Sequence, residues 1–238
     1  YLYNQGFIKK TEDLKSVQVD WDVESAVVVT RGGISNLEKR LEKRTVTSGC
    51  GQGTVFGDMM EDLDKIKLNS PALRQSSFYR LLKNIREYNE VYKKSGAVHG
   101  CALCKDEKIE IFIEDVGRHN ATDAIAGYML LEQIDGSDKL FYTTGRLTSE
   151  MVIKVAQMGI PILFSRAGIT KMGLELSQKL GVTTISRAAG KHFLVYNGAE
   201  TVIYDAKPLE RTDSRFHSSG DSEESPVHDR RRGAELST

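Results

Sequence analysis

Cys50 lies in a glycine-rich segment, residues 47–53, with a glycine on each side of it. Glycine lets the backbone adopt angles that other residues avoid, so a thiol in such a loop can be exposed and can approach another molecule closely. Only the thiolate is a nucleophile, and the backbone N–H groups of a glycine-rich loop favour the anion. The pattern is typical of a nucleophilic or persulfide-carrying cysteine, although a flexible turn that happens to contain a cysteine has the same sequence.

Two further cysteines, Cys101 and Cys104, form a Cys-x-x-Cys pair with His99 just before it. This spacing serves a redox pair and half a zinc site equally well. The pair lies in a β-like run, however, where side chains three positions apart point to opposite faces. We therefore expect both thiols to be small core residues rather than metal ligands or a disulfide.

A zinc deaminase needs a His or Cys, a Glu two residues later and then Pro-Cys-x-x-Cys. Here Gly100 and Cys101 follow His99, no proline precedes Cys101, and the next glutamate is Glu107. The deaminase set is therefore missing from this sequence, and we predict no metal site.

Residues 114–120, Glu-Asp-Val-Gly-Arg-His-Asn, run from a predicted strand into a predicted helix. The N–H groups at such a junction suit an anion, and α/β sheets bind ligands at these positions. Arg118 and His119 add positive charge and hydrogen-bond donors. The alternative is purely local: Asn120 caps the helix, Asp115 pairs with Arg118, and nothing binds.

Three more strand ends carry arginines, namely Arg146, Arg166 directly after Ser165, and Arg187. The carboxyl ends of parallel strands share one edge of a sheet, so these side chains and Arg118 are expected to converge there. Guanidinium groups bind phosphate oxygens in a bidentate manner. The sequence thus predicts a phosphorylated or nucleotide ligand near the Cys50 loop.

The elements that must position these residues begin with a long amphipathic helix from Asn69, Ser70 and Pro71 to about Lys94. Its predicted apolar face holds Phe78, Leu81, Leu82, Ile85 and Tyr88. Two β-runs follow at residues 97–104 and 109–114, joined by a charged turn, and they predict a hairpin.

Helices and strands then alternate. The predicted helices are residues 120–134, 149–158 and 169–180, and the predicted strands are residues 139–144, 160–165, 183–187, 193–196 and 201–205. The first of these helices has an expected apolar face of Ala121, Ala124, Ile125, Tyr128 and Leu131. This alternation predicts an α/β fold, a three-layer sandwich whose sheet is parallel in its centre and antiparallel at its edges.

The remaining segments predict the domain organisation. Residues 1–68, with one β-run at residues 26–30, are expected to be a smaller β or irregular region that displays the Cys50 loop. Residues 69–206 form the α/β domain. Residues 207–238 are rich in Ser, Asp, Glu and Arg with little to bury, which predicts a disordered polar tail.

The 238 residues carry 33 basic and 33 acidic side chains, so the chain has no net charge that would attract nucleic acid or a charged membrane surface. No apolar run approaches the ~20 residues of a membrane helix, and residues 1–20 have no signal-peptide core. The chain has three cysteines, an odd number, and this does not fit the set of disulfide bonds that is typical of a small secreted protein. A cytoplasmic location is the expectation, and because the first residue is Tyr we expect that a native N-terminal segment is missing.

Taken together, these motifs resemble the FdhD family of formate dehydrogenase accessory sulfurtransferases, over roughly residues 46–205. The most specific match is residues 114–121 followed by Asp123, and the Cys50 loop, His99, and the segments 146–150 and 165–170 support it. Arg187 with Tyr196 downstream also fits. The resemblance implies a cytidine-deaminase-like fold that lacks the deaminase zinc.

The resemblance also implies a function. The protein would accept sulfur from a cysteine desulfurase as a Cys50 persulfide and deliver it to the bis-molybdopterin guanine dinucleotide cofactor, before that cofactor enters the formate dehydrogenase apoenzyme. A homodimer is expected. The cofactor would contact the last strand-to-strand segment, which maps onto Ile185, Ser186, Arg187, Ala188, Ala189 and Gly190, together with Arg118, His119, Arg146, Ser165 and Arg166.

The sequence departs from the family in the loop, because many members carry Cys-x-x-Cys there whereas Gly53 holds the second position here, and Cys101 and Cys104 replace the small residues usual after the His. A chaperone that binds and delivers the cofactor without a persulfide step is therefore an alternative. A zinc-dependent hydrolase built on His99, Cys101 and Cys104 is a third hypothesis.

Overall fold

The computed structural model describes residues 1–34, 44–45, 54–55, 63 and 65–206. Tyr1–Pro208 form one compact unit. Cys50 and the predicted tail lie outside the described residues, and the predicted domain boundary at residue 68 stays a prediction. Within the described part of the chain, no helix combines the length and the apolar character that crossing a membrane requires.

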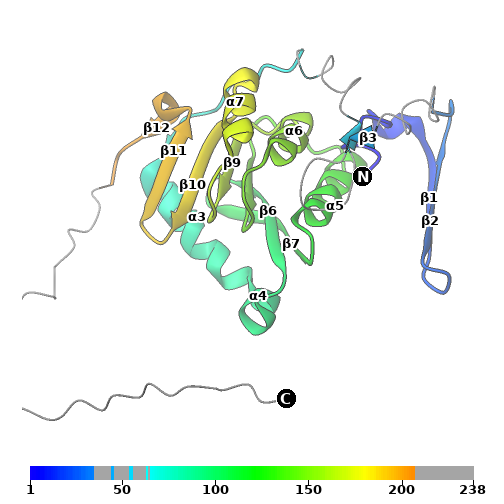
Figure 1. Cartoon of the computed structure of the whole chain (residues 1–238), viewed down its shortest axis with the longest axis horizontal. Coiled ribbons are helices and arrows are strands. Elements are labelled where there is room, and N and C mark those ends of the chain that lie inside the picture. The colour runs from blue at the N-terminus through cyan, green and yellow to red at the C-terminus, as the bar shows by residue number, and fades with distance from the viewer. Residues whose placement is uncertain (35–43, 46–53, 56–62, 64, 207–238) are drawn as a thin grey trace, which may run out of the picture. The chain divides into compact units, whose positions relative to one another are not determined.

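A six-stranded mixed sheet forms the centre of this unit, in the order β11-β10-β9-β8-β6-β7 (Figure 1). The three middle strands β8, β9 and β10 run parallel to one another, whereas β11, β6 and β7 pair antiparallel. The bounds are β6 His99–Lys105, β7 Lys108–Asp115, β8 Leu140–Thr143, β9 Ile162–Ser165, β10 Thr183–Ala189 and β11 His192–Asn197. The predicted arrangement, parallel in the centre and antiparallel at the edges, is confirmed.

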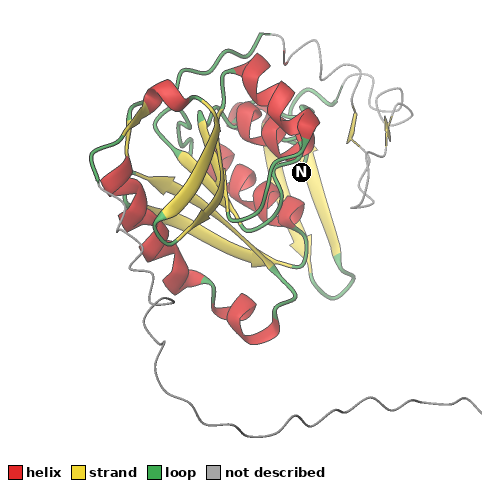
Figure 2. Cartoon of the chain, turned by 60° about the vertical axis from the view of Figure 1, so that its left-hand side comes forward, coloured by secondary structure: helices red, strands yellow, loops and turns green. Residues whose placement is uncertain are grey.

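Helices cover both faces of this sheet, which gives three layers (Figure 2). On one face α5 (Arg118–Leu131), α6 (Ser149–Gln157) and α7 (Lys171–Leu180) bury a core that includes Leu103, Phe141 and Leu163. On the other face α3 (Gln75–Tyr88) packs on a core that includes Tyr142 and Phe164. All four residues of β8 and of β9 are buried, as expected for parallel strands covered on both sides.

The predicted long helix before the hairpin was wrong in its extent. Leu73 and Arg74 form strand β5 (Leu73–Arg74), which pairs with β12 (Val202–Ile203), so the helix begins only at Gln75. Asn89, with φ −77° and ψ 61°, ends α3, and a separate helix α4 (Glu90–Ser95) follows. A strand pairing and a backbone break, neither visible in the periodicity, therefore replace one helix by two.

The predicted apolar face of α5 was also partly wrong. The helix begins at Arg118 rather than Asn120, and Tyr128 and Leu131 are 46% and 53% exposed. The apolar side chains that α5 buries are Ala121, Ile125, Ala126 and Met129. The buried stripe is rotated because polar side chains, among them Arg118 and Thr122, occupy part of the inner face.

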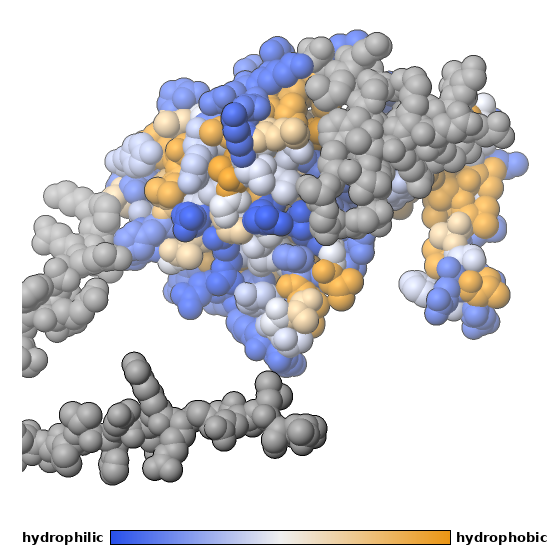
Figure 3. Space-filling model, in the orientation of Figure 1, coloured by the Kyte–Doolittle hydropathy of each residue, from blue (hydrophilic) through white to orange (hydrophobic). Residues whose placement is uncertain are grey.

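The N-terminal region contains a 3-10 turn, η1 (Thr11–Asp13), and an antiparallel hairpin of β1 (Leu14–Asp20) and β2 (Ser25–Thr30). Only β2 had been predicted. The hairpin exposes valines such as Val17, Val19 and Val27, seen as orange surface at the right of Figure 3. It contributes little to the hydrophobic core.

Two short strands, β3 (Arg44–Thr45) and β4 (Thr54–Val55), pair antiparallel with each other. Cys50 lies between them in the sequence, so the chain segment that carries this thiol starts and ends at one two-stranded ladder. A short turn, η2 (Ala199–Thr201), leads into β12.

Candidate functional site

Two adjoining cavities lie at the carboxyl edge of the parallel strands, where α/β sheets place their ligand sites. The larger cavity has a volume of about 630 Å³ and the smaller about 470 Å³, and Tyr92, Gly96 and Arg166 line both. Volumes of this size are typical of small-molecule sites. The edge predicted to bind a ligand therefore carries the space for one.

The larger cavity has apolar walls and a cationic rim. Leu82 and Ile85 of α3, the ring of Tyr142 and the buried Ala188 provide the apolar surface. Three exposed cations also line it, namely Arg86, Lys93 and Arg166. Such a cavity suits a ligand with a flat ring system and an anionic part.

The smaller cavity is more polar. His99 at the start of β6, Thr144 after β8, and Arg166 and Ala167 after β9 line it. The His99 Nδ1 atom lies 3.2 Å from the Thr144 hydroxyl, which also accepts the Gly100 N–H at 3.1 Å. Burial, and then the charge of Arg118, lower the pKa of His99 below its ordinary value, so the imidazole is neutral at pH 7.

Glu114 fixes the helix that closes both cavities. Its carboxylate accepts the backbone N–H of Val91 at 2.9 Å and that of Tyr92 at 2.8 Å, at the first turn of α4. A carboxylate there pairs with the free N–H groups of the helix start. Glu114 is thus a positioning residue for Tyr92, not a ligand-binding residue.

Ser165 holds the turn that carries Arg166. Its hydroxyl donates to the Gly145 carbonyl at 2.5 Å and accepts the Ala167 N–H at 2.9 Å. The guanidinium carbon of Arg166 lies 5.7 Å from the centre of the Tyr92 ring, within cation–π range. Ser165 is fully buried, so it acts by orienting Arg166 rather than by contacting a ligand.

Of the predicted segment from Ile185 to Gly190, only its end reaches the larger cavity. Ala188, Ala189 and Gly190 line it, whereas Ile185 and Ser186 are buried within the sheet. Arg187 adopts a left-handed conformation with φ 52°, and the register of β10 with β11 shifts at this point. This irregularity turns the strand end toward the cavity, in keeping with the occurrence of such bulges beside binding sites.

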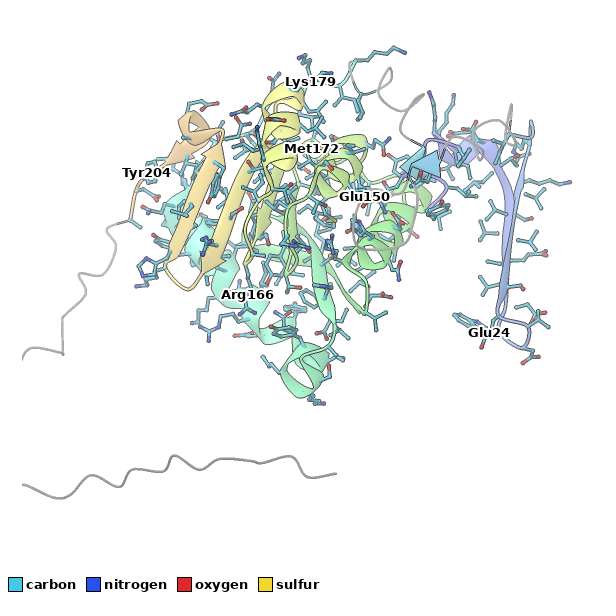
Figure 4. All side chains as sticks on the ribbon, in the orientation of Figure 1. Glu24, Glu150, Arg166, Met172, Lys179 and Tyr204 are labelled. Atoms are coloured by element: carbon cyan, nitrogen blue, oxygen red, sulfur yellow. The ribbon has the colours of Figure 1, made fainter. Side chains whose placement is uncertain are left out.

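Arg118 and His119 lie at the start of α5, and both are buried. The Arg118 side chain packs over Gly145, where a Cβ atom would come within 2.4 Å of its Cδ. The Nε2 atom of His119 lies 3.3 Å from a carboxylate oxygen of Glu150 in α6, which Figure 4 labels. Burial, and then the charges of Arg118 and Lys154, lower the pKa of His119 to about 4.

The predicted convergence of four arginines is therefore only partly found. Arg166 lines both cavities, and Arg118 is near enough to His99 to influence it. Arg146 and Arg187 are exposed and line neither of these two cavities.

The turn at residues 114–120 differs from the local alternative, and anion binding there stays a prediction. Asp115, not Asn120, organises the turn: its Oδ1 atom accepts the Gly117 N–H at 2.8 Å and the Asn120 side-chain N–H at 3.0 Å. The predicted cap by Asn120 was wrong.

The divergence of the two buried cysteines is confirmed. Cys101 packs in the core under α5 and α6, and Cys104 in the core under α3, so the sheet separates them. Burial raises the pKa of Cys101 to about 11 and also raises that of Cys104. Among the residues that the structure describes, no group of three His, Cys, Asp or Glu side chains could hold a metal ion, so nothing here supports the zinc hydrolase hypothesis.

Several cavity residues were missed from the sequence, chiefly Tyr92 and Lys93 of α4 and Leu82 of α3. Gly96 could have indicated these residues from the sequence, because a glycine often ends a helix in a left-handed conformation, as Gly96 does for α4. Glu114 had been assigned to an anion-binding segment, and its role as the cap of α4 needed the tertiary structure.

The fold and the site define a class, a three-layer α/β protein with a ligand cavity at the carboxyl edge of its parallel strands. The chain belongs to the FdhD/NarQ family, whose model matches residues 1–203.

Proteins named sulfur carrier protein FdhD are among its relatives. The one from Bacillus pumilus is 31% identical over 198 residues, covering 82% of this chain and 75% of the relative. The one from Wolinella succinogenes is 34% identical over 199 residues, covering 82% and 68%. A crystal structure of a Desulfotalea psychrophila protein, assigned as a formate dehydrogenase accessory protein, matches with a TM-score of 0.67 and 28% identity over 85% of this chain and 76% of that one.

Proposed function

We propose that this chain is a sulfur carrier that supports the maturation of a formate dehydrogenase. Its Cys50 accepts sulfur from a cysteine desulfurase as a persulfide and passes it to the bis-molybdopterin guanine dinucleotide cofactor before that cofactor enters the apoenzyme. The cavity at the carboxyl edge of the sheet, with cationic side chains at its rim, is the observation that supports binding of the cofactor. The names of its relatives support the sulfur part.

In the loading step, the Cys50 thiolate attacks the outer sulfur of the donor's persulfide. A new S–S bond forms at Cys50, the donor's S–S bond breaks, and the donor cysteine leaves as a thiolate, so no external oxidant is needed. Cys101 and Cys104 are poor substitutes, because both are buried and their raised pKa values leave little thiolate at neutral pH.

The cofactor is the recipient of the sulfur and is therefore a substrate of this protein. A guanine nucleotide arm has a flat ring for the apolar walls at Leu82 and Ile85, and phosphates for Arg166. The paired strands β3 and β4 bracket the segment that holds Cys50. A homodimer remains a prediction.

A chaperone without a persulfide step is the alternative, and the presence of Gly53 in place of a second loop cysteine favours it. The cavity suits both functions equally, so only the fate of the Cys50 thiol separates them.

The test is maturation of formate dehydrogenase in cells that lack their own family member. Cys50→Ala should abolish formate dehydrogenase activity, whereas Ser48→Ala, a substitution in the same loop, should restore it as the starting protein does. If Cys50→Ala supports full activity, the persulfide function is wrong and the chaperone is favoured.

A further inference from the structure

The hairpin of β1 and β2 exposes a group of large apolar side chains, part of the orange surface in Figure 3. The exposed residues are Val17, Val19, Trp21, Val23, Val27 and Val29. The side chain at the turn, Trp21, is 84% exposed. A two-stranded hairpin alone is marginally stable in water, and exposed apolar groups that lie together mark interaction sites. The hairpin is therefore a surface for a partner.

The outer edge of β2 lacks the features with which proteins protect exposed strands. Among the described strands, β1 and β2 form a sheet of their own, so each has one edge that no described strand covers. The six residues of β2, Ser25–Thr30, include no charged residue and no proline, whereas β1 carries Lys15 and Asp20. Charges and prolines on an edge strand hinder pairing with another chain, and β-branched residues favour it. The edge of β2 is thus the one that is open to an added strand.

The register of the hairpin leaves two valines of β2 without apolar neighbours on β1. Val27 lies opposite Gln18, and Val29 lies opposite Ser16. The two valines share one face of the hairpin, because side chains two positions apart in a strand point the same way. A further strand beside β2 would supply the apolar contact that β1 does not offer on this face.

We propose that β2 pairs antiparallel with β2 of a second copy of this chain, about a two-fold axis at Val28. The pairing places Val27 opposite the partner's Val29 on both sides of the axis, and Ala26 opposite the partner's Thr30. Valine meets valine and no like charges face each other, so the edge is complementary to itself. The four-stranded sheet that results has more than the three strands that independent stability requires. This inference goes beyond the proposed function, which expects a homodimer but names no interface.

The test is analytical ultracentrifugation of the full chain over a range of concentrations, which measures the Kd of the dimer. Val27→Lys should raise this Kd about tenfold or more, because it changes two symmetry-related contacts. Gln18→Lys is the matched control, since it adds the same charge directly opposite Val27 but on the strand away from the new pairing. It should leave the Kd unchanged. Both side chains are exposed, so both variants should keep the circular dichroism spectrum of the starting protein.

Two double variants test the register. Val27→Lys combined with Val29→Glu places opposite charges across the two-fold axis and should lower the Kd again from that of Val27→Lys alone. Val27→Lys combined with Val29→Lys places like charges there and should raise the Kd further. Equal Kd values for the two double variants would overturn the pairing about Val28.

A starting chain that is monomeric at every concentration, or a dimer that Val27→Lys leaves intact, would overturn the proposal. Equal weakening by Val27→Lys and Gln18→Lys would also overturn it, because the edge of β2 would then not be the interface. These outcomes leave the sulfur step of the proposed function intact, since that step is tested separately at Cys50.

Discussion

The carboxylate of Glu114 accepts the backbone N–H of Tyr92 at 2.8 Å and thereby links the end of β7 to the start of α4. Tyr92 lines both cavities and lies beneath the guanidinium of Arg166. A residue at the end of an edge strand thus sets the position of the helix that closes the site. The acidic pair Glu114 and Asp115 acts on the backbone around the site rather than on a ligand.

Substituting Glu114 should therefore affect binding through the position of α4. Glu114→Ala removes two hydrogen bonds from the helix start and should lower the free energy of unfolding by about 0.5–2 kcal/mol. The amide protons of Val91 and Tyr92 should exchange faster with solvent, and GDP, used as a probe for the guanine nucleotide arm of the proposed cofactor, should bind more weakly. Glu87→Ala, an exposed change on α3, is the control and should alter none of these three properties. Unchanged exchange at Tyr92 would contradict this role of Glu114.

The three thiols should differ in reactivity. Cys101 and Cys104 are fully buried on opposite sides of the sheet, so iodoacetamide should label the native protein once, at Cys50. All three cysteines should react after unfolding in guanidinium chloride. Peptide mapping by mass spectrometry locates the label, and rapid native labelling of Cys101 or Cys104 would show that this part of the structure is wrong.

Acid should destabilise the protein through His119. Its pKa is about 4 in the folded chain and near 6.5 in the unfolded chain, so the unfolded state binds more protons between these values. The stabilisation is complete above about pH 6.5 and is lost as the pH falls toward 4. His119→Gln should therefore lose less stability than the starting protein between pH 7 and pH 4.5, by on the order of 2 kcal/mol.

Urea denaturation at several pH values measures this difference. His192→Gln, on the exposed side of β11, is the control and should keep the pH dependence of the starting protein. Equal pH dependence in the starting protein and in His119→Gln would contradict the buried, neutral state of His119.

The sequence predicted the sheet because its signals there are local. Short, largely apolar strands such as β8 and β9 alternate with helices of 9 to 14 residues, and this alternation favours parallel pairing with crossovers. The opposite directions of Cys101 and Cys104 followed from the two-residue period of a strand. The edge of the sheet that carries the cavities was predicted for the same reason.

The details of the site depend on contacts between distant residues, which periodicity does not encode. The break at Asn89 and the cap from Glu114 create α4, and so supply Tyr92 to both cavities. His119 was expected to bind an anion, but burial and the neighbouring charges of Arg118 and Lys154 lower its pKa and make it a neutral internal residue. Arg146 looked equivalent to Arg166, yet Arg146 follows Gly145, whereas Arg166 follows the buried Ser165, whose hydrogen bonds hold the turn beside the cavities.

The most direct test of the central claim is intact-protein mass spectrometry after incubation with a cysteine desulfurase and cysteine. The starting protein should gain one sulfur atom, ~32 Da, and Cys50→Ala should gain none. Ser48→Ala should gain sulfur as the starting protein does. A starting protein that gains no sulfur, or a gain that persists without Cys50, would contradict the proposal that this thiol carries sulfur.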